Sequence, residues 1–177
     1  KDKKLIEVIT SEENKFWKFI SKNVYLSKSL INLDKRLLAN YYKNRGYYDV
    51  RILDNYVELD NKNFSFDLIY NIDAGLKYTI NELSLTLPDD YEKKDFNNIF
   101  KIFENNKNNI YSLEFINQIL NDIENIASNK SYDFIDVKVV EDKIHKNKLN
   151  FNFVVSDSNK FYIEKIDISG NYTTIEE

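Results

Sequence analysis

An internal repeat of about 83 to 87 residues constrains the fold of this 177-residue chain more than any other sequence feature. Five pairs of segments recur in the same order: 25–37 with 111–123, 46–47 with 131–132, 49–52 with 136–139, 66–72 with 149–155, and 77–85 with 160–168. The offset between the copies changes only at the connecting loops, as insertions and deletions in a true repeat would produce. The chain is therefore predicted to contain copies of one structural unit.

Hydrophobic periodicity predicts the order strand, helix, helix, strand, strand within each unit. Alternating patterns predict strands near 64–72, 78–85, 149–155 and 161–168. Apolar residues at helical spacing predict helices near 30–41, 96–103 and 116–126, with a shorter helix around Leu5 and Ile9. The pattern changes phase within 78–85 and within 161–168, which either a bulge or a two-sided environment of the strand would explain.

The repeat divides the chain into three parts. Residues 1–77 form a unit that lacks its first strand, residues 78–160 form a complete unit, and residues 161–177 contain the first strand and the start of a further unit. Only about five residues, 73–77, join the first unit to the second. We therefore expect the units to be linked tightly rather than through a flexible tether.

Single residues carry further expectations. Ser112 is suited to cap the helix that follows it, as is Ser27 or Ser29 for the helix near 30–41. Gly46 suits a left-handed C-terminal cap. Asp34 is expected to form a surface ion pair with its neighbours Lys35 and Arg36. The single histidine, His145, lies in a charged run and is expected in a solvated loop.

Composition and motifs argue against several classes of protein. The net charge is −4 and the isoelectric point about 5.2, which oppose nucleic-acid binding by charge, and the Gly-x-x-Gly clamp of a small α/β nucleic-acid-binding module is missing. The chain has no cysteine, no phosphate-binding loop, no catalytic triad and no metal-ligand spacing. No apolar run is long enough for a transmembrane helix. We therefore predict a binding protein with no catalytic residue, cofactor or metal, and not an enzyme.

Several motifs resemble the POTRA (polypeptide-transport-associated) family. In residues 33–50 a helix ending in Tyr-Tyr leads through Arg-Gly-Tyr towards a strand, which is similar to the family signature. The turn residues that carry the likeness are Gly46 and Tyr47, Gly75 after the third strand, and Gly170 and Asn171 after residues 166–168. The complete unit departs from the pattern at Ser131, where glycine is usual, and at Leu87-Pro88, which replaces Gly-Asn.

This resemblance implies an α+β fold of tandem POTRA units (βααββ), each a three-stranded mixed sheet with two helices packed on one face. It implies a periplasmic scaffold within an outer-membrane protein. The implied partners are unfolded outer-membrane β-barrel proteins and assembly-machine lipoproteins, with a periplasmic chaperone as a further partner. Proteins that assemble the outer membrane are the nearest likeness, with the chain covering their third and fourth units and the first strand of the fifth. An alternative is the POTRA array of a two-partner secretion or translocation-assembly transporter.

The family arrangement places the second strand of each unit at a sheet edge, here over Tyr48–Tyr56 and Phe134–Val140. An edge strand exposes unpaired N–H and C=O groups that can accept another extended chain. The candidate residues for partner binding are Tyr48, Asp49, Val50, Arg51, Ile52 and Leu53 on one edge, and Phe134, Ile135, Asp136, Val137, Lys138 and Val139 on the other. Alternating charges on both segments are interpreted either as guards against aggregation or as solvated faces.

Overall fold

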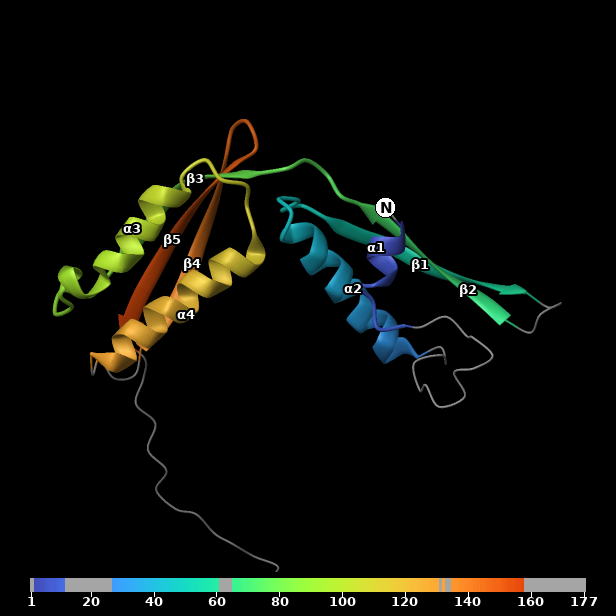
Figure 1. Ribbon diagram of the computed structural model, residues 1–177, viewed down its shortest axis with the longest axis horizontal. Helices are drawn as coiled ribbons and strands as arrows, with labels where there is room; N and C mark the ends of the chain where they lie inside the picture. The colour runs from blue at the N-terminus through green and yellow to red at the C-terminus, as the bar shows by residue number, and fades with distance from the viewer. Residues whose placement is uncertain (1, 12–26, 61–64, 131, 133–134, 158–177) are drawn as a thin grey trace, which may run out of the picture.

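The computed structural model describes residues 2–11, 27–60, 65–130, 132 and 135–157 (Figure 1). The first unit contains helix α1 (Asp2–Ile6), helix α2 (Lys28–Lys43), strand β1 (Arg51–Asp60) and strand β2 (Ser65–Asp73). The second contains strand β3 (Thr79–Thr86), the 3-10 helix η2 (Lys93–Phe96), helices α3 (Asn97–Asn106) and α4 (Leu113–Asn129), and strands β4 (Ile135–Ile144) and β5 (Lys148–Asp157). The strand predicted near 161–168, with Gly170 and Asn171, lies outside the described residues.

The second unit has the predicted βααββ order and a three-stranded mixed sheet. The strand order is β3-β5-β4, with β3 parallel and β4 antiparallel to the central β5. Helices α3 and α4 lie on one face of this sheet (Figure 1). The register shifts between Ile80 and Glu82, which confirms a bulge, one of the two explanations for the change of phase. The fold class predicted from the sequence is therefore confirmed.

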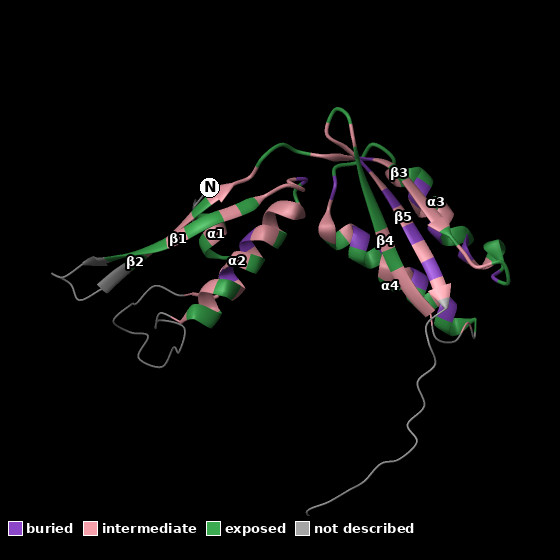
Figure 2. Ribbon diagram, turned by 180° about the vertical axis from the view of Figure 1, so that it is seen from behind, coloured by how far each residue is buried: buried purple, intermediate pink, exposed green. Residues whose placement is uncertain are grey.

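The core of the second unit lies between the sheet and its two helices. Alternate residues of β5 are buried while their neighbours are not, as the bands along this strand show in Figure 2. The predicted inward residues, Leu149, Phe151, Phe153 and Val155, are all buried. They meet Phe96, Ile99 and Phe103 around α3 and Ile116, Ile119 and Ile123 of α4. Each such side chain contributes roughly 1.5 to 3 kcal/mol when removed from water.

Ser112 caps α4 as predicted, since its hydroxyl accepts a hydrogen bond from the backbone N–H of Phe115 at 3.4 Å. Ser27 occupies the corresponding position before α2, but its side chain makes no capping hydrogen bond. Different interactions therefore hold the beginnings of the two equivalent helices.

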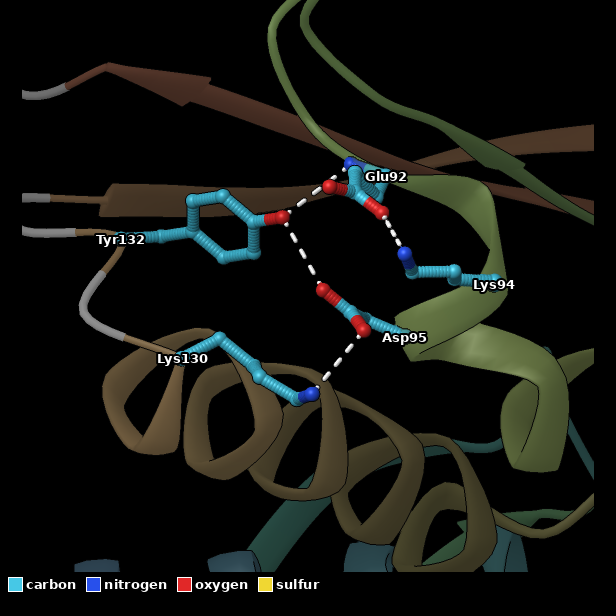
Figure 3. A network of polar contacts seen from close by, with 5 residues as sticks. All are labelled: Glu92, Lys94, Asp95, Lys130 and Tyr132. Carbon is cyan, nitrogen blue, oxygen red and sulfur yellow. Dashed lines mark hydrogen bonds and ion pairs between the residues drawn. The ribbon is translucent and has the colours of Figure 1, made fainter.

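A polar network ties α4 to η2 at the end of the second unit (Figure 3). Asp95 accepts hydrogen bonds from Lys130, at 3.0 Å, and from the hydroxyl of Tyr132, at 3.1 Å. The same hydroxyl accepts from the backbone N–H of Glu92, whose carboxylate pairs with Lys94. Tyr132 also stacks on Tyr91, with ring centroids 4.0 Å apart. This network positions the chain just before it enters β4.

In the first unit, β1 and β2 form an antiparallel hairpin, and α2 packs on one of its faces. The sequence pattern predicted a buried face of α2 along Leu30, Leu33, Leu37 and Tyr41, yet these four residues are only half-buried. The fully buried residues of the helix are Asp34 and Leu38. The inward face is therefore rotated by about one residue from the predicted one.

Asp34 lies on this inward face, and the expectation of a surface ion pair was wrong. The side chain is fully buried. One carboxylate oxygen accepts hydrogen bonds from the backbone N–H groups of Thr10, at 2.6 Å, and Ser11, at 3.3 Å. The other accepts from the hydroxyl of Tyr70 on β2 at 3.0 Å. A buried carboxylate needs such donors because an unpaired charge away from water is very costly.

We predict that Asp34→Ala destabilises the chain by about 2 kcal/mol or more, because three partly buried donors lose their acceptor. Urea unfolding followed by circular dichroism measures the change. Glu124→Ala is the matched control, since Glu124 is exposed on α4 and pairs with no other described residue. The control is expected to change stability by no more than about 0.5 kcal/mol. Equal effects of the two substitutions would contradict the role assigned to Asp34.

Candidate functional site

Among the described residues, β1, β2, β3 and β4 each have a neighbouring strand on one side only. The sequence predicted a binding edge on the second strand of each unit, which corresponds to β1 and β4. Strand β4 pairs only with β5, and β1 pairs only with β2. Each strand is ten residues long. The main-chain groups on the outer side of each strand are therefore available to a further strand.

The boundaries of the first edge differ from the prediction. Strand β1 begins at Arg51, so Tyr48, Asp49 and Val50 lie in the turn before it rather than on the edge. In this turn the N–H of Tyr48 donates to the carbonyl of Gly46 at 3.0 Å, and the N–H of Val50 donates to Tyr47 at 3.3 Å. Ile52 and Leu53 do belong to β1, with a bulge between Ile52 and Asp54.

The second edge matches the prediction closely over its described part. Ile135, Asp136, Val137, Lys138 and Val139 all lie on β4. Phe134 lies outside the described residues. Val137 and Val139 pack against the core from this edge, whereas Val140 is 55% exposed.

The charges on these strands pair along or across the sheet. Lys138 contacts Asp136, two residues earlier on β4, at 2.9 Å. On the hairpin, Arg51 reaches Asp73 of β2 at 2.6 Å, and Asp54 accepts from Asn71 of β2, also at 2.6 Å. Exposed pairs of this kind add little stability. Their partners are on the same strand or on the neighbouring one, so they leave the outer main-chain groups of β1 and β4 uncovered.

Gly46 lies where the first unit meets the second. It is buried and has a φ of +95°, a conformation that favours glycine. Its carbonyl accepts a hydrogen bond from the N–H of Tyr78, just before β3, at 2.8 Å. A Cβ atom at this position would lie 2.7 Å from Cγ2 of Ile110. The glycine of the Arg-Gly-Tyr motif therefore allows both the turn and the close approach of the two units.

Tyr48 inserts its ring from the first unit into the second. The ring packs edge-on against Tyr111, with centroids 5.2 Å apart, and in a tilted arrangement against Tyr78, with centroids 5.6 Å apart. Its hydroxyl donates a hydrogen bond to Glu141 near the end of β4. Burial, together with this bond to a carboxylate, raises the pKa of the Tyr48 hydroxyl. One end of the second unit's core is thus closed by a residue of the first unit.

Asp49 joins the same turn to both outer strands of the second sheet. Its carboxylate pairs with Lys143 on β4 and accepts a hydrogen bond from the hydroxyl of Tyr78, beside β3, at 2.6 Å. These two donors, Lys143 above all, hold the pKa of the Asp49 carboxyl below its usual value.

Asn44, at the end of α2, caps the helix α4 of the other unit. Its side-chain oxygen accepts from the backbone N–H of Glu114 at 2.9 Å, and its amide faces the Glu114 carboxylate at 3.5 Å. The first backbone N–H groups of a helix have no partner within the helix, so this contact satisfies one of them. Periodicity alone does not reveal this role or those of Tyr48 and Asp49, because their partners lie far away in the sequence, from Tyr78 to Lys143.

The remaining candidates are placed as follows. Gly75 has a φ of +67° in the linker, consistent with its turn motif. Tyr47 follows Gly46 in the junction turn, and His145 is exposed in the turn between β4 and β5, as expected. Within the described ranges, no group of three His, Cys, Asp or Glu side chains could hold a metal ion. No helix in the same ranges is long and apolar enough to cross a membrane.

Comparisons with known proteins agree with this fold. A family model described as POTRA, surface antigen variable number repeat, matches residues 1–75. The outer membrane protein assembly factor BamA of Buchnera aphidicola is 27% identical over 162 residues, which cover 90% of this chain and 25% of that protein. BamA of Neorickettsia risticii is 23% identical over 174 residues, covering 98% of this chain and 23% of that protein. The chain thus spans about a quarter of the length of these curated relatives.

Among solved structures, the crystal structure of Haemophilus influenzae BamA POTRA3-5 is similar in fold. It has 17% sequence identity and a TM-score of 0.72, and the match covers 99% of this chain and 68% of that one. Residues 1–75 therefore match the POTRA family model, as the motifs in this part of the sequence predicted. The chain as a whole is similar in sequence to BamA proteins and similar in fold to BamA POTRA domains.

We predict that Gly46→Ala destabilises the chain more than Gly75→Ala does. Both alanines would adopt a left-handed conformation, at a cost of roughly 1 to 2 kcal/mol. Only the alanine at 46 also meets a neighbour too closely, since the nearest atom to a Cβ at 75 lies at 3.8 Å. Urea unfolding compares the two variants.

Shortening Ile110 should then relieve the contact at position 46. The double substitution of Gly46→Ala with Ile110→Ala is expected to lose less than the sum of the two single losses. Strict additivity would show that the close approach to Ile110 does not determine the need for glycine.

Stability should also depend on Asp49 at acid pH. A carboxyl whose pKa is lowered by folding stabilises the native state fully above its unfolded value, here about 3.8, and this contribution is lost as the pH falls through the lower folded value. Asp49→Asn should therefore be less stable than the parent chain near neutral pH, with a smaller further loss on acidification. Unfolding free energies at about pH 7 and pH 3 test this. If Asp49→Asn loses as much stability between pH 7 and pH 3 as the parent chain does, this role of Asp49 is contradicted. Both proteins should still lose some stability on acidification, because folding also lowers the pKa values of Asp73 and Asp95.

Proposed function

We propose that this chain is the periplasmic scaffold and receptor region of an outer-membrane β-barrel assembly machine. In this role it binds nascent outer-membrane proteins by adding their strands to its open sheet edges. The observation that carries the proposal is β4, a ten-residue strand that is paired on one side only. The similarity to BamA, named an outer membrane protein assembly factor, supplies the cellular context.

Edge addition suits a receptor that has many different clients. The added strand is held by main-chain hydrogen bonds, which do not depend on side-chain identity. A transmembrane β-strand has about 9 to 11 residues. Its length therefore matches that of β4 and of β1, so one client strand can occupy a whole edge.

The energetics favour binding that is readily reversed. Four or five added hydrogen bonds at roughly 1 kcal/mol each stabilise the complex by about 5 kcal/mol. The ordering of the client and the loss of its free motion oppose much of that gain. The expected dissociation constants are millimolar to high micromolar, which allows the client to be released.

The scaffold part of the proposal concerns position and further partners. We place the chain in the periplasm as part of an outer-membrane protein, with its units as the third and fourth POTRA domains and the start of a fifth. The likeness to the three-domain structure of POTRA3-5 supports this numbering. Accessory lipoproteins, and a periplasmic chaperone, would dock on surfaces that the client leaves free.

The test is an NMR titration of the isotope-labelled chain with a ten-residue peptide copied from a transmembrane strand of an outer-membrane β-barrel. We expect weak, saturable shifts confined to 51–60, to 135–144, or to both. Direct main-chain pairing predicts this localisation because the hydrogen bonds form along one edge.

A backbone-methylated version of the peptide is the matched control, since it keeps the side chains but loses the N–H donors that face the edge. It is expected to bind at least several-fold more weakly. Shifts on the helical faces, or equal binding of the methylated peptide, would refute strand addition. Absence of any shift at millimolar peptide would reduce the chain's role to spacing and partner docking.

A further inference from the structure

We propose that the open edges of β4 and β1 form one continuous binding track, on which a single extended polypeptide pairs with both units at once. This inference rests on the proposed function and specifies its ligand. The occupant is an unfolded chain of at least about 20 residues, rather than a single short strand.

The two edges meet at the junction between the units. Lys143, the last residue but one of β4, pairs with Asp49, which lies two residues before β1 begins. Glu141 of β4 accepts the hydrogen bond from Tyr48 in the same turn. The end of one edge strand is therefore bonded directly to the approach of the other.

The two strands also run in a compatible direction. Strand β4 runs towards the junction and ends there, whereas β1 starts at the junction and runs away from it (Figure 1). A client that lies antiparallel to β1 can continue antiparallel to β4 without reversing. If the strands ran in opposite senses, one extended chain would have to pair in parallel with one edge and antiparallel with the other.

The contacts of Asp49 bring the turn before β1 to the edge strand β4. The chain passes from β2 through Tyr78 into β3, which is the edge of the second sheet opposite β4. Asp49 bridges from Tyr78 to Lys143, and so spans from the β3 side to the β4 side. The turn that leads into β1 is therefore in direct contact with the edge strand β4.

An open cavity lies beside the first residues of β1, where a client would cross from one unit to the other. Its volume is about 530 Å³, and its lining includes Lys43, Val50, Arg51 and Asp73. The remaining lining residues are Tyr48 and Asp49 of the junction turn and Gly75 of the linker.

Two weak binding sites together give a large gain in affinity only when their relative position is fixed. Once a client is bound to one edge, the other edge meets its free half at an effective concentration in the millimolar range. The contacts of Gly46, Tyr48 and Asp49 described above hold the second edge within reach. A client that spans the junction should thus bind much more tightly than either half.

The experiment uses three peptides and the 177-residue chain. Two are ten-residue barrel strands, and the third joins them through four glycines, which can span up to about 13 Å. We expect the joined peptide to bind at least about tenfold more tightly than its better half, with one-to-one stoichiometry and simultaneous NMR shifts in 51–60 and 135–144. A control peptide of equal length, with prolines throughout one half, should lose this gain because proline donates no hydrogen bond.

The Asp49→Ala variant separates the track from the two edges. Residue 49 lies outside both strands, so each short peptide should bind the variant with the same affinity as it binds the parent chain. The gain in affinity of the joined peptide over the short ones should fall. A joined peptide that is no tighter than its better half, or that binds two copies of the chain, overturns the continuous track and leaves single-edge binding intact. Failure of all three peptides to bind either edge would overturn the proposed function as well.

Discussion

Gly46 is buried, has a left-handed backbone and approaches Ile110 so closely that a Cβ atom would lie 2.7 Å from its nearest atom. The turn that it forms carries Tyr48 into the core of the second unit and brings Asp49 between Tyr78 and Lys143. A larger residue at this position would have to displace the side chain of Ile110 and adopt a strained backbone conformation, which would weaken these contacts. The relation between the two sheets, and between their open edges, thus depends on one residue without a side chain.

A three-stranded sheet with helices on one face can be stable while its edges stay open. Its core is complete once the helices cover that face, and nothing in the packing requires a fourth strand. The outer main-chain groups of β4 are left open, and the same is true of β1 in the first unit. Stability comes from the apolar layer around Phe151 and Phe153, whereas binding is proposed for the edges. Buried side chains thus hold the fold, whereas the main chain of the edge strands is proposed to bind a client.

Much of this fold was predictable from local patterns. The alternation along β5, the helical spacing around Ile119 and the cap at Ser112 each depend on neighbours within a few residues, so the sequence reveals them directly. The prediction for Asp34 was wrong because a charged residue beside Lys35 and Arg36 is expected at the surface when its distant partners are unknown. The groups that donate hydrogen bonds to its carboxylate belong to Thr10 and Tyr70, which only folding brings close to it. Tyr48 to Val50 were assigned to an edge strand for a similar reason.

By itself, the sequence determined the repeat, the order of elements, the mixed α+β class and the likeness to POTRA domains, because periodicity and turn glycines are written in short segments. Only the tertiary structure decided which side chains serve the junction. Tyr48 packs on Tyr111, Asp49 pairs with Lys143, and the side chain of Asn44 accepts a hydrogen bond from the backbone N–H of Glu114. Each of these pairs joins residues more than 60 positions apart. Such contacts depend on how the two units are packed together, and no local pattern of hydrophobicity encodes that arrangement.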